Sequence, residues 1–217
     1  VSDFIRQQVL PHYGIGFDKV TISALGNGHI NQTYLVRWPQ GEFVLQKINT
    51  DVFTQPQELL QNARYISEHL QQQQDAHCYK LQVVKPVQTQ DNQYGVDLKS
   101  LGFWRAITYL PNSHTIEVVN NTEQAKMAAS AFGHFAAALS SLSPNCIKDV
   151  IDDFLNLPFR LNQLKQAVTN DKCQRLAGCQ QWVDLVFSQT TLFEELKRVE
   201  SLLPLRVCHN DTKINNM

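Results

Sequence analysis

Residues 20–48 read VTISALGNGHINQTYLVRWPQGEFVLQKI, and they set the architecture of the amino-terminal half. Apolar and polar residues alternate over residues 33–37 and again over 43–48, which is the period of a half-buried β-strand. The two runs are joined by residues 39–41, whose proline and glycine are typical of a turn. Upstream, residues 25–31 form a glycine-containing loop that follows a short first strand. This stretch therefore predicts three successive strands, with a glycine loop between the first and the second.

A helix is predicted directly after the hairpin. Thr54 is the expected N-cap, with Gln57 three residues on and Pro56 in the first turn. The apolar positions that recur at helical spacing are Leu59, Ala63, Ile66 and Leu70. Two further strand-like segments follow, residues 81–84 and 102–110, so that the amino-terminal part holds about five strands and one helix.

The chain becomes helix-rich after Pro111. Helical periodicity is present over residues 127–139, 159–168 and 180–199. We place a domain boundary near Leu110, because strand-rich sequence gives way there to helix-rich sequence. The prediction is an α+β fold of two lobes: an N-terminal lobe, residues 1–110, and a helical C-terminal lobe, residues 111–217.

Composition excludes several classes of protein. The chain has 217 residues, 43% of them hydrophobic and 18% charged, and its 19 basic and 20 acidic residues give a net charge of -1. Nothing in this balance calls for a nucleic-acid or membrane partner. No apolar run approaches the roughly 20 residues of a membrane span, and the first residues lack the pattern of a signal peptide. We expect a cytoplasmic protein, whose oligomeric state the sequence leaves open.

The cysteines give no sign of a disulfide framework or of a zinc ribbon. They are five in number and scattered, and no Cys-x-x-Cys pair occurs among them. Their positions are Cys78, Cys146, Cys173, Cys179 and Cys208. We expect reduced thiols in buried structural positions, which is the usual habit of free cysteine.

The sharpest motif is His-Asn-Asp-Thr-Lys-Ile-Asn-Asn at residues 209–216. It matches the kinase catalytic loop, in which His-x-Asp is followed five residues later by Asn. Phosphoryl transfer needs a carboxylate that orients the attacking hydroxyl and takes its proton, together with an amide oxygen that helps to hold Mg²⁺. Asp211 and Asn216 supply that pair. His209 is expected to brace the loop and to take no part in the chemistry.

The nucleotide would be held upstream of this loop. Gly26-Asn27-Gly28 fits a loop that covers phosphates, because residues without a Cβ let backbone N–H groups approach closely, although such a pair of glycines is also common in plain tight turns. Lys47 lies on a predicted strand and could bind the phosphates, although most strand lysines are only solvated. The assignment depends on order along the chain: glycine loop, lysine, helix, hinge, catalytic loop.

Two further features belong to this nucleotide site. Glu58 is the candidate partner of Lys47, but its place in the first turn of the helix is equally well explained by the helix dipole. Glu68 is the fallback. Thr108-Tyr109-Leu110 ends the last strand at the predicted lobe boundary, where backbone groups could meet an adenine edge. Burial of Tyr109 in the core explains that segment as well.

Taken together, these motifs resemble the aminoglycoside-phosphotransferase superfamily, and within it the N-acetylhexosamine 1-kinase group. The phrases that carry the resemblance are residues 26–31, residues 43–49, Trp104-Arg105 and residues 209–216. They are spread over nearly the whole chain. The resemblance implies a protein-kinase-like two-lobe fold and a transfer of the γ-phosphoryl group of ATP, with Mg²⁺, to a hydroxyl of a small molecule, here the anomeric hydroxyl of an amino sugar.

The resemblance also implies roles for individual residues. Asp211 would be the base, Asn216 would bind metal, Lys47 would bind the phosphates, and the glycine loop would cover them. Asp153 and Arg160 match an acid- and arginine-bearing segment of the group only loosely and are left out of the site.

One departure from the superfamily pattern concerns the second metal-binding aspartate, which follows the catalytic loop in such kinases. This sequence ends at Met217, one residue past Asn216. From the sequence we expect a truncated C-terminal lobe and no turnover by these 217 residues alone.

Other functions remain open at this stage. The catalytic loop does not specify the acceptor, so an amino alcohol, homoserine or a thio-sugar is an alternative to the amino sugar. A non-catalytic nucleotide-binding module is the alternative from another class. Sulfate-ester hydrolysis has no support, because none of the cysteines is followed four residues later by the arginine of a sulfatase motif.

Overall fold

The computed structural model describes residues 1–26 and 30–216. The chain divides into two compact units, one formed by Val1–Ile151 with Arg206–Met217 and the other by Asp152–Leu205. The lobe boundary expected near Leu110 falls inside the first unit, and the division into lobes 1–110 and 111–217 stays a prediction.

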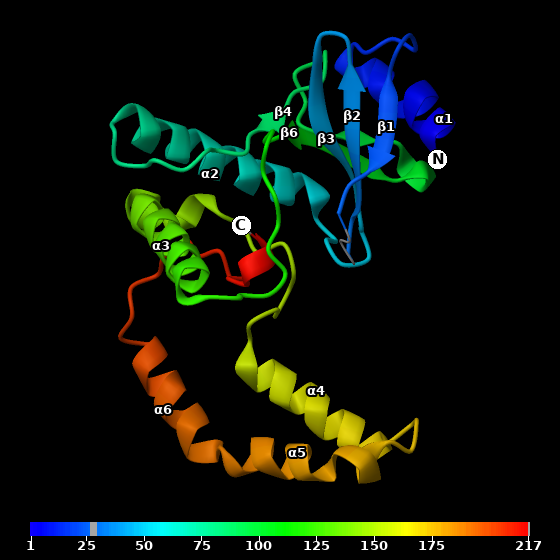
Figure 1. Cartoon of the computed structure of the whole chain (residues 1–217). Coiled ribbons are helices and arrows are strands. Elements are labelled where there is room, and N and C mark those ends of the chain that lie inside the picture. The colour runs from blue at the N-terminus through cyan, green and yellow to red at the C-terminus, as the bar shows by residue number, and fades with distance from the viewer. Residues whose placement is uncertain (27–29, 217) are drawn as a thin grey trace. The chain divides into compact units, whose positions relative to one another are not determined.

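The first unit is built on an antiparallel sheet (Figure 1), to which the described residues contribute six strands. The strand order is β1-β2-β3-β6-β4, and β5 pairs with β6 at one end. The strands are β1 (Thr21–Ala24), β2 (Gln32–Trp38), β3 (Gly41–Ile48), β4 (Pro86–Val87), β5 (Val96–Asp97) and β6 (Phe103–Thr108). The predicted hairpin is confirmed, because β2 and β3 pair along their full length and close at Trp38 and Gly41.

The expected strand over residues 81–84 is wrong. Those residues form no strand, and β4 begins only at Pro86. The physical reason is packing: Leu81 and Val83 lie against a hydrophobic cluster formed by helices and take no part in a β-ladder.

Alternate side chains give the sheet two faces, and we name each by what covers it. The N-helix face carries the main core and is covered by three short N-terminal helical turns, α1 (Ser2–Phe4), η1 (Ile5–Val9) and η2 (Leu10–Tyr13). Its buried residues are Ile5, Val9, Leu10, Ile15, Val20, Val36, Phe43, Leu45, Val96, Trp104 and Ala106. These helical turns were not predicted, since segments of three to five residues are too short to show a helical period.

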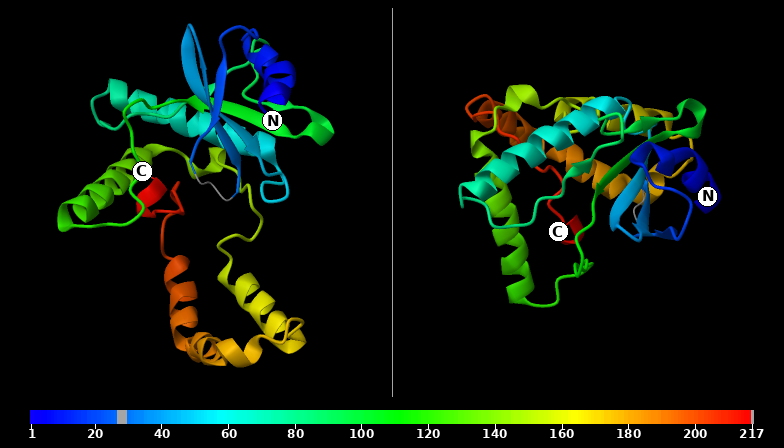
Figure 2. Two further views of the ribbon diagram at one scale, coloured as in Figure 1. Left: turned by 45° about the vertical axis from the view of Figure 1, so that its right-hand side comes forward. Right: turned by 90° about the horizontal axis from the view of Figure 1, so that it is seen from above.

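The opposite face packs against α2 (Pro56–Asp75), and we call it the α2 face. Ile48 and Phe103 are opposite one another in the β3–β6 register and form a cluster with Leu60 of the helix. Figure 2 gives two further views of α2 and the sheet. Thr54 is not the N-cap, because Gln55 occupies that position and makes no side-chain cap bond. Pro56 at the start of the helix lacks an N–H, which removes one of the donors that a helix start leaves unpaired.

A second cluster joins the end of α2 to α3 (Thr122–Ala138) and to η4 (Leu139–Ser141), which continues it. The side chain of Asn121 caps α3 by accepting a hydrogen bond of 2.9 Å from the N–H of Gln124. The buried members of the cluster are Leu70, Tyr79, Ala138, Leu139 and Val207. Short 3-10 turns complete this unit at η3 (Lys99–Leu101), η5 (Pro144–Cys146) and η6 (Ile214–Asn216).

The second unit consists of α4 (Leu157–Asn170), α5 (Leu176–Ser188) and α6 (Thr190–Glu200). The helical stretch predicted over residues 180–199 is two helices that meet at Gln189. Of the residues described in this unit, Val183 alone is a buried hydrophobic residue. Its packing is therefore much sparser than that of the sheet.

The cysteines are not buried as expected. All five are free, Cys146 is partly covered, and the other four are exposed. They lie on helix surfaces and connecting segments that no element covers. Within the described residues, no helix is both long and apolar enough to cross a lipid bilayer.

Candidate active site

The segment that leads into the predicted catalytic loop is anchored in the second cluster. Val207 is only 8% exposed and packs there. Two residues on, the ring of His209 lies edge-on to Phe132 and Phe135 of α3, with ring centroids 5.4 and 5.7 Å away. Nδ1 of His209 accepts a hydrogen bond of 3.3 Å from the N–H of Asp211. The imidazole thus ties the loop to α3, and this geometry fits the bracing role expected for it.

Asp211 and Asn216 meet directly. Nδ2 of Asn216 donates hydrogen bonds to the Asp211 carboxylate at 2.7 Å and to the Asp211 carbonyl at 2.9 Å. The remaining amide atom, Oδ1 of Asn216, accepts no hydrogen bond from the described residues. The turn between them starts at Asn210, whose φ of 64° lies in the left-handed region that asparagine tolerates. The Asp211 side chain is 59% exposed, so an acceptor molecule can reach it.

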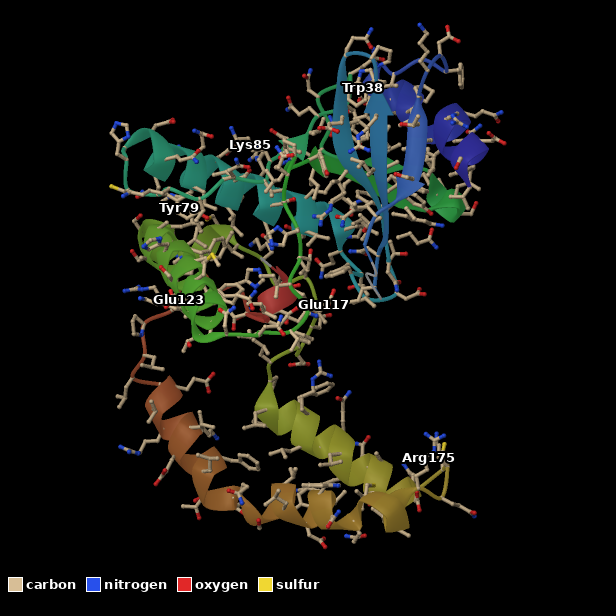
Figure 3. The ribbon with its side chains drawn as sticks, in the orientation of Figure 1. Trp38, Tyr79, Lys85, Glu117, Glu123 and Arg175 are labelled. Atoms are coloured by element: carbon tan, nitrogen blue, oxygen red, sulfur yellow. The ribbon has the colours of Figure 1, made fainter. Side chains whose placement is uncertain are left out.

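Two more polar contacts surround this pair. The ammonium of Lys213 lies 3.7 Å from the Asp211 carboxylate. Nδ2 of Asn215 donates to the carboxylate of Glu117 at 3.1 Å, while Oδ1 of Asn215 is buried without a partner among the described residues. Figure 3 shows Glu117, on the segment between β6 and α3, beside the C-terminal turn. The loop is thereby fixed to the chain on the far side of the predicted hinge.

The glycine loop is described only in part. Gly26 has a φ of 71°, and a Cβ built there would meet nothing within 4 Å, so the backbone is open on that side. The loop is closed by a hydrogen bond of 2.9 Å from the N–H of Leu25 to the carbonyl of Thr33. The other predicted members, Asn27 and Gly28, lie outside the described residues.

Lys47 lies on the N-helix face. It is opposite Trp104 in the sheet, and its Nζ is 5.9 Å from the centre of that ring. Its aliphatic stem packs against Gly102, whose φ of 106° and lack of a Cβ make room for it. In the part of the chain that the structure describes, no carboxylate oxygen lies within 4 Å of Nζ.

The two glutamates considered as partners of Lys47 lie elsewhere. Glu58 is in the first turn of α2, and its Oε2 is buried without a hydrogen-bond partner among the described residues. Glu68 pairs with Arg64 one turn earlier, at 3.8 Å. The structure joins neither of them to Lys47, so the pairing stays a prediction.

The α2 face carries a polar row that crosses three strands. Thr33, Gln46 and Arg105 are neighbours in the register. Nε2 of Gln46 donates to the hydroxyl of Thr33 at 3.2 Å, and Nε of Arg105 donates to Oε1 of Gln46 at 2.9 Å. Burial lowers the pKa of Arg105 to about 10, which still leaves the guanidinium charged at neutral pH. We call these three residues the polar row.

An apolar row lies next to it on the same face. It consists of the cross-strand neighbours Leu35, Val44 and Ile107. Each lies two residues from a member of the polar row, on the side of the predicted hinge. Leu35 and Val44 are buried, yet neither belongs to the three hydrophobic clusters of the described residues. On the α2 face the polar row therefore lies between this apolar row and the apolar pair Ile48 and Phe103, which pack against Leu60.

The hinge residues follow the apolar row. The backbone N–H of Thr108 donates to the carbonyl of Lys85 at 2.9 Å, and its hydroxyl accepts from the N–H of Lys85 at 3.0 Å. The amide of Thr108 is thus already used. The ring of Tyr109 lies 5.6 Å from the guanidinium carbon of Arg37, and Leu110 is half-buried where the chain leaves the sheet.

The described residues supply only a few of the ligands that a metal ion would need. Within the described residues, no group of three or more His, Cys, Asp or Glu side chains comes together. The donors near the loop are oxygens, namely Oδ1 of Asn216 and the carboxylate of Asp211, and these are the ligands that Mg²⁺ prefers. Mg²⁺ usually keeps several waters and takes phosphate oxygens as ligands, so this small donor set fits it.

Among the described residues, two open pockets lie beside α2. Their volumes are about 310 and 300 Å³, and both are bounded by α2 and Lys85. Amide and charged side chains make up most of their walls. Neither contains a residue of the predicted catalytic loop or of the polar row, but the second is lined by Thr108 and Leu110 of the predicted hinge.

The model of the phosphotransferase enzyme family matches residues 21–217, from the start of β1 through the catalytic loop. The chain belongs to the phosphotransferase enzyme family. The superfamily resemblance inferred from the motifs is thereby confirmed, while the N-acetylhexosamine kinase group within the phosphotransferases stays a prediction.

The fold is similar to that of a spectinomycin phosphotransferase, whose crystal structure was determined in complex with ADP and spectinomycin. The TM-score is 0.51 at 13% sequence identity, covering 99% of this chain and 64% of that chain. This chain therefore spans 64% of that phosphotransferase's length. At this identity the likeness shows the fold alone. It confirms the expected protein-kinase-like α+β fold class.

Sequence reasoning missed the contacts that the structure adds to the site. In the sequence, Gln46 and Arg105 stand out only as members of the phrases that carry the family resemblance. Strict alternation along β3 was the available signal, because it places Gln46 and Lys47 on opposite faces. The contact of Glu117 with the loop had no signal, since it joins residues 98 positions apart.

Proposed function

We propose that this chain carries the nucleotide-binding sheet and the catalytic loop of an ATP-dependent kinase that phosphorylates a hydroxyl of a small molecule. One observation carries the proposal. A carboxylate and an amide, Asp211 and Asn216, lie 2.7 Å apart in an exposed turn that is braced on α3. Membership of the phosphotransferase family supports the same chemistry.

In the proposed reaction Asp211 is the general base. The hydroxyl oxygen of the acceptor attacks the γ-phosphorus, the bond from that phosphorus to the β–γ bridging oxygen breaks, and ADP leaves. Asp211 orients the hydroxyl and takes its proton. The ammonium of Lys213, which lies near that carboxylate, adds positive charge where negative charge gathers on the transferred group.

The metal would be held by Asn216 through Oδ1. Its Nδ2 is already used by Asp211, and this fixes the amide with its oxygen free. Mg²⁺, when bound there, neutralises charge on the phosphates. Asn216 thus serves both to position the base and to supply a ligand.

The nucleotide would lie along the α2 face. We place the adenine over the apolar row, next to the hinge residues Thr108, Tyr109 and Leu110. Because Thr108 N–H is engaged by Lys85, the adenine edge is left to Tyr109 and Leu110. The loop that contains Gly26 would cover the phosphates. The structurally similar spectinomycin phosphotransferase was crystallised with ADP, which supports nucleotide use here.

For the acceptor we propose an amino sugar such as an N-acetylhexosamine, on the phrase similarity of residues 26–31 and 43–49 to that kinase group. An amino alcohol, homoserine and a thio-sugar are the competing acceptors. A panel of these compounds, assayed with the full-length gene product for ATP-dependent phosphate transfer, decides between them. Phosphorylation of an N-acetylhexosamine above all others supports the proposal, and phosphorylation of homoserine instead would overturn the choice of acceptor.

Asp211→Asn tests the catalytic role. In the full-length gene product we expect kcat to fall by about 10²- to 10⁴-fold, the range for loss of a general base, with the affinity for ADP nearly unchanged. Asp18→Asn, at an exposed site outside the loop, is the matched control and leaves kcat as it is. Full activity in Asp211→Asn, with nucleotide binding retained, would favour a non-catalytic nucleotide-binding module.

A further inference from the structure

The two faces of β3 separate Lys47 from the surface on which α2 packs. Leu45 and Lys47 point to the N-helix face, whereas Val44, Gln46 and Ile48 point to the α2 face. In protein kinases the phosphate-binding lysine of this strand pairs with a glutamate of the following helix. A cation that serves this role must therefore share a face with α2.

Arg105 is the cation on that face. In the β3–β6 register it lies opposite Gln46, which comes immediately before Lys47 in the chain. Its Nε is held by Gln46, and Gln46 is in turn held by Thr33, so the orientation of the guanidinium is fixed through two hydrogen bonds. Its two terminal nitrogens donate to none of the described residues, and neither is fully buried.

The charge of Arg105 is left without a counter-ion. Among the described residues, no carboxylate oxygen comes within 4 Å of its guanidinium. Burying a charge costs free energy unless an opposite charge approaches it, and a guanidinium fork matches phosphate oxygens in a bidentate manner. The unpaired edge of Arg105 is suited to an anion that comes from outside the chain.

The position of Arg105 along the sheet also suits a residue that binds phosphate. The polar row lies two residues from the apolar row, which is about 7 Å along a strand, and on the side of the glycine loop. A nucleotide with its base at the hinge end would direct its phosphates toward the polar row. Resting on the proposed function, we infer that Arg105, positioned by Gln46, is the residue of the sheet that binds the nucleotide phosphates.

Lys47 has a different explanation. Its ammonium lies near the face of the Trp104 ring and its stem fills the space above Gly102, on the face that the N-terminal helical turns cover. A cation over an aromatic ring beside an apolar core is a common structural arrangement. Lys47 is therefore the matched control for Arg105. Both are cations on strands beside Gln46: Lys47 follows it in the chain, and Arg105 lies opposite it in the β3–β6 register.

The test is calorimetric titration of Mg·ADP, and separately of adenosine, into the wild-type chain and three variants. Arg105→Gln should weaken ADP binding by about 10- to 100-fold, the range for loss of a charged hydrogen-bonding partner, and leave adenosine binding unchanged within about twofold. Gln46→Glu should also weaken ADP binding, because its carboxylate would occupy the guanidinium. Lys47→Gln should bind both ligands as the wild type does.

The outcomes separate this inference from the function on which it rests. If the wild type binds neither ADP nor adenosine, the proposed function fails and the inference fails with it. If the wild type binds ADP and the loss appears in Lys47→Gln but not in Arg105→Gln, the function stands and the inference is overturned. Should Arg105→Gln fail to fold, Gln46→Glu decides, and wild-type ADP affinity in that variant overturns the assignment.

Discussion

At the scale of single residues, the chemistry depends on which atom of the Asn216 amide is free. Its nitrogen is bonded to Asp211 twice, and its oxygen has no partner among the described residues. One amide therefore positions the proposed base and presents a hard oxygen ligand next to it. Neighbouring Asn215 is different, because its nitrogen is bonded to Glu117 and its oxygen is buried.

Asn216→Ala should raise the Mg²⁺ concentration needed for half-maximal activity by about tenfold or more, as expected when the environment of a bound metal loses a ligating or orienting group. Activity of the full-length gene product is measured against Mg²⁺ concentration at saturating ATP. Asn215→Ala is the control and should leave that concentration unchanged. Equal shifts in the two variants would show that the turn, and not the amide oxygen of Asn216, determines metal use.

The residues of the proposed catalytic loop could be selected from sequence, because His-x-Asp and the later Asn form a local motif with fixed spacing, and their catalytic roles stay predictions. The inferred role of Arg105 could not be predicted in this way. Lys47 was expected to bind the phosphates because of its order along the chain, and that role stays a prediction, whereas the face on which a strand residue lies depends on which face the next helix covers. That choice is made by tertiary packing, here of Ile48 and Phe103 against Leu60.

At the scale of secondary-structure elements, the loop is positioned by the cluster that joins α2, α3 and η4. Leu139 at the end of α3 has no exposed surface, and Val207, two residues before His209, packs in the same cluster. The catalytic turn itself is exposed and short, so most of its order comes from this anchor and from the ring contacts of His209 with α3.

Leu139→Ala should lower the free energy of unfolding by about 2–5 kcal/mol, the usual cost of a cavity in a close-packed core. Met127→Ala, at a position on α3 that is 59% exposed, should change it by no more than about 0.5 kcal/mol. Urea denaturation followed by circular dichroism measures both. Similar losses in the two variants would mean that the cluster around Leu139 does not hold α3 in place.

Among the elements, the hairpin β2–β3 and helices α2, α3 and α4 were predicted because each carries a clear hydrophobic period. The two-residue strands β4 and β5 were not, because a pair of residues has no period and forms a strand only by meeting β6. The N-terminal helical turns were missed for the same reason.

At the scale of the whole molecule, the two units differ in how much they bury. The first holds three hydrophobic clusters, whereas in the described part of the second Val183 alone is a buried hydrophobic residue. Local opening requires little exposure of new apolar surface where few side chains are buried. The second unit should therefore open more readily than the sheet.

Hydrogen exchange measured by mass spectrometry tests this difference. Peptides from α4, α5 and α6 should exchange their amides faster than peptides from β3 and β6, because the strands lie between two packed faces. Peptides from α3 give an internal reference for helices in the first unit. Amide exchange in α5 as slow as in β3 would contradict the expectation that the sparsely buried second unit opens more readily.

The most direct measurement of the central claim is the broadening of side-chain NMR signals by Mn²⁺ bound with ADP. If the loop and the polar row act on one metal–nucleotide complex, the side-chain amides of Asn216 and Gln46 and the Nε–H of Arg105 should broaden together, and more strongly than the indole N–H of Trp104 on the other face. Broadening of Asn216 with no effect on Gln46 and Arg105 would contradict the account.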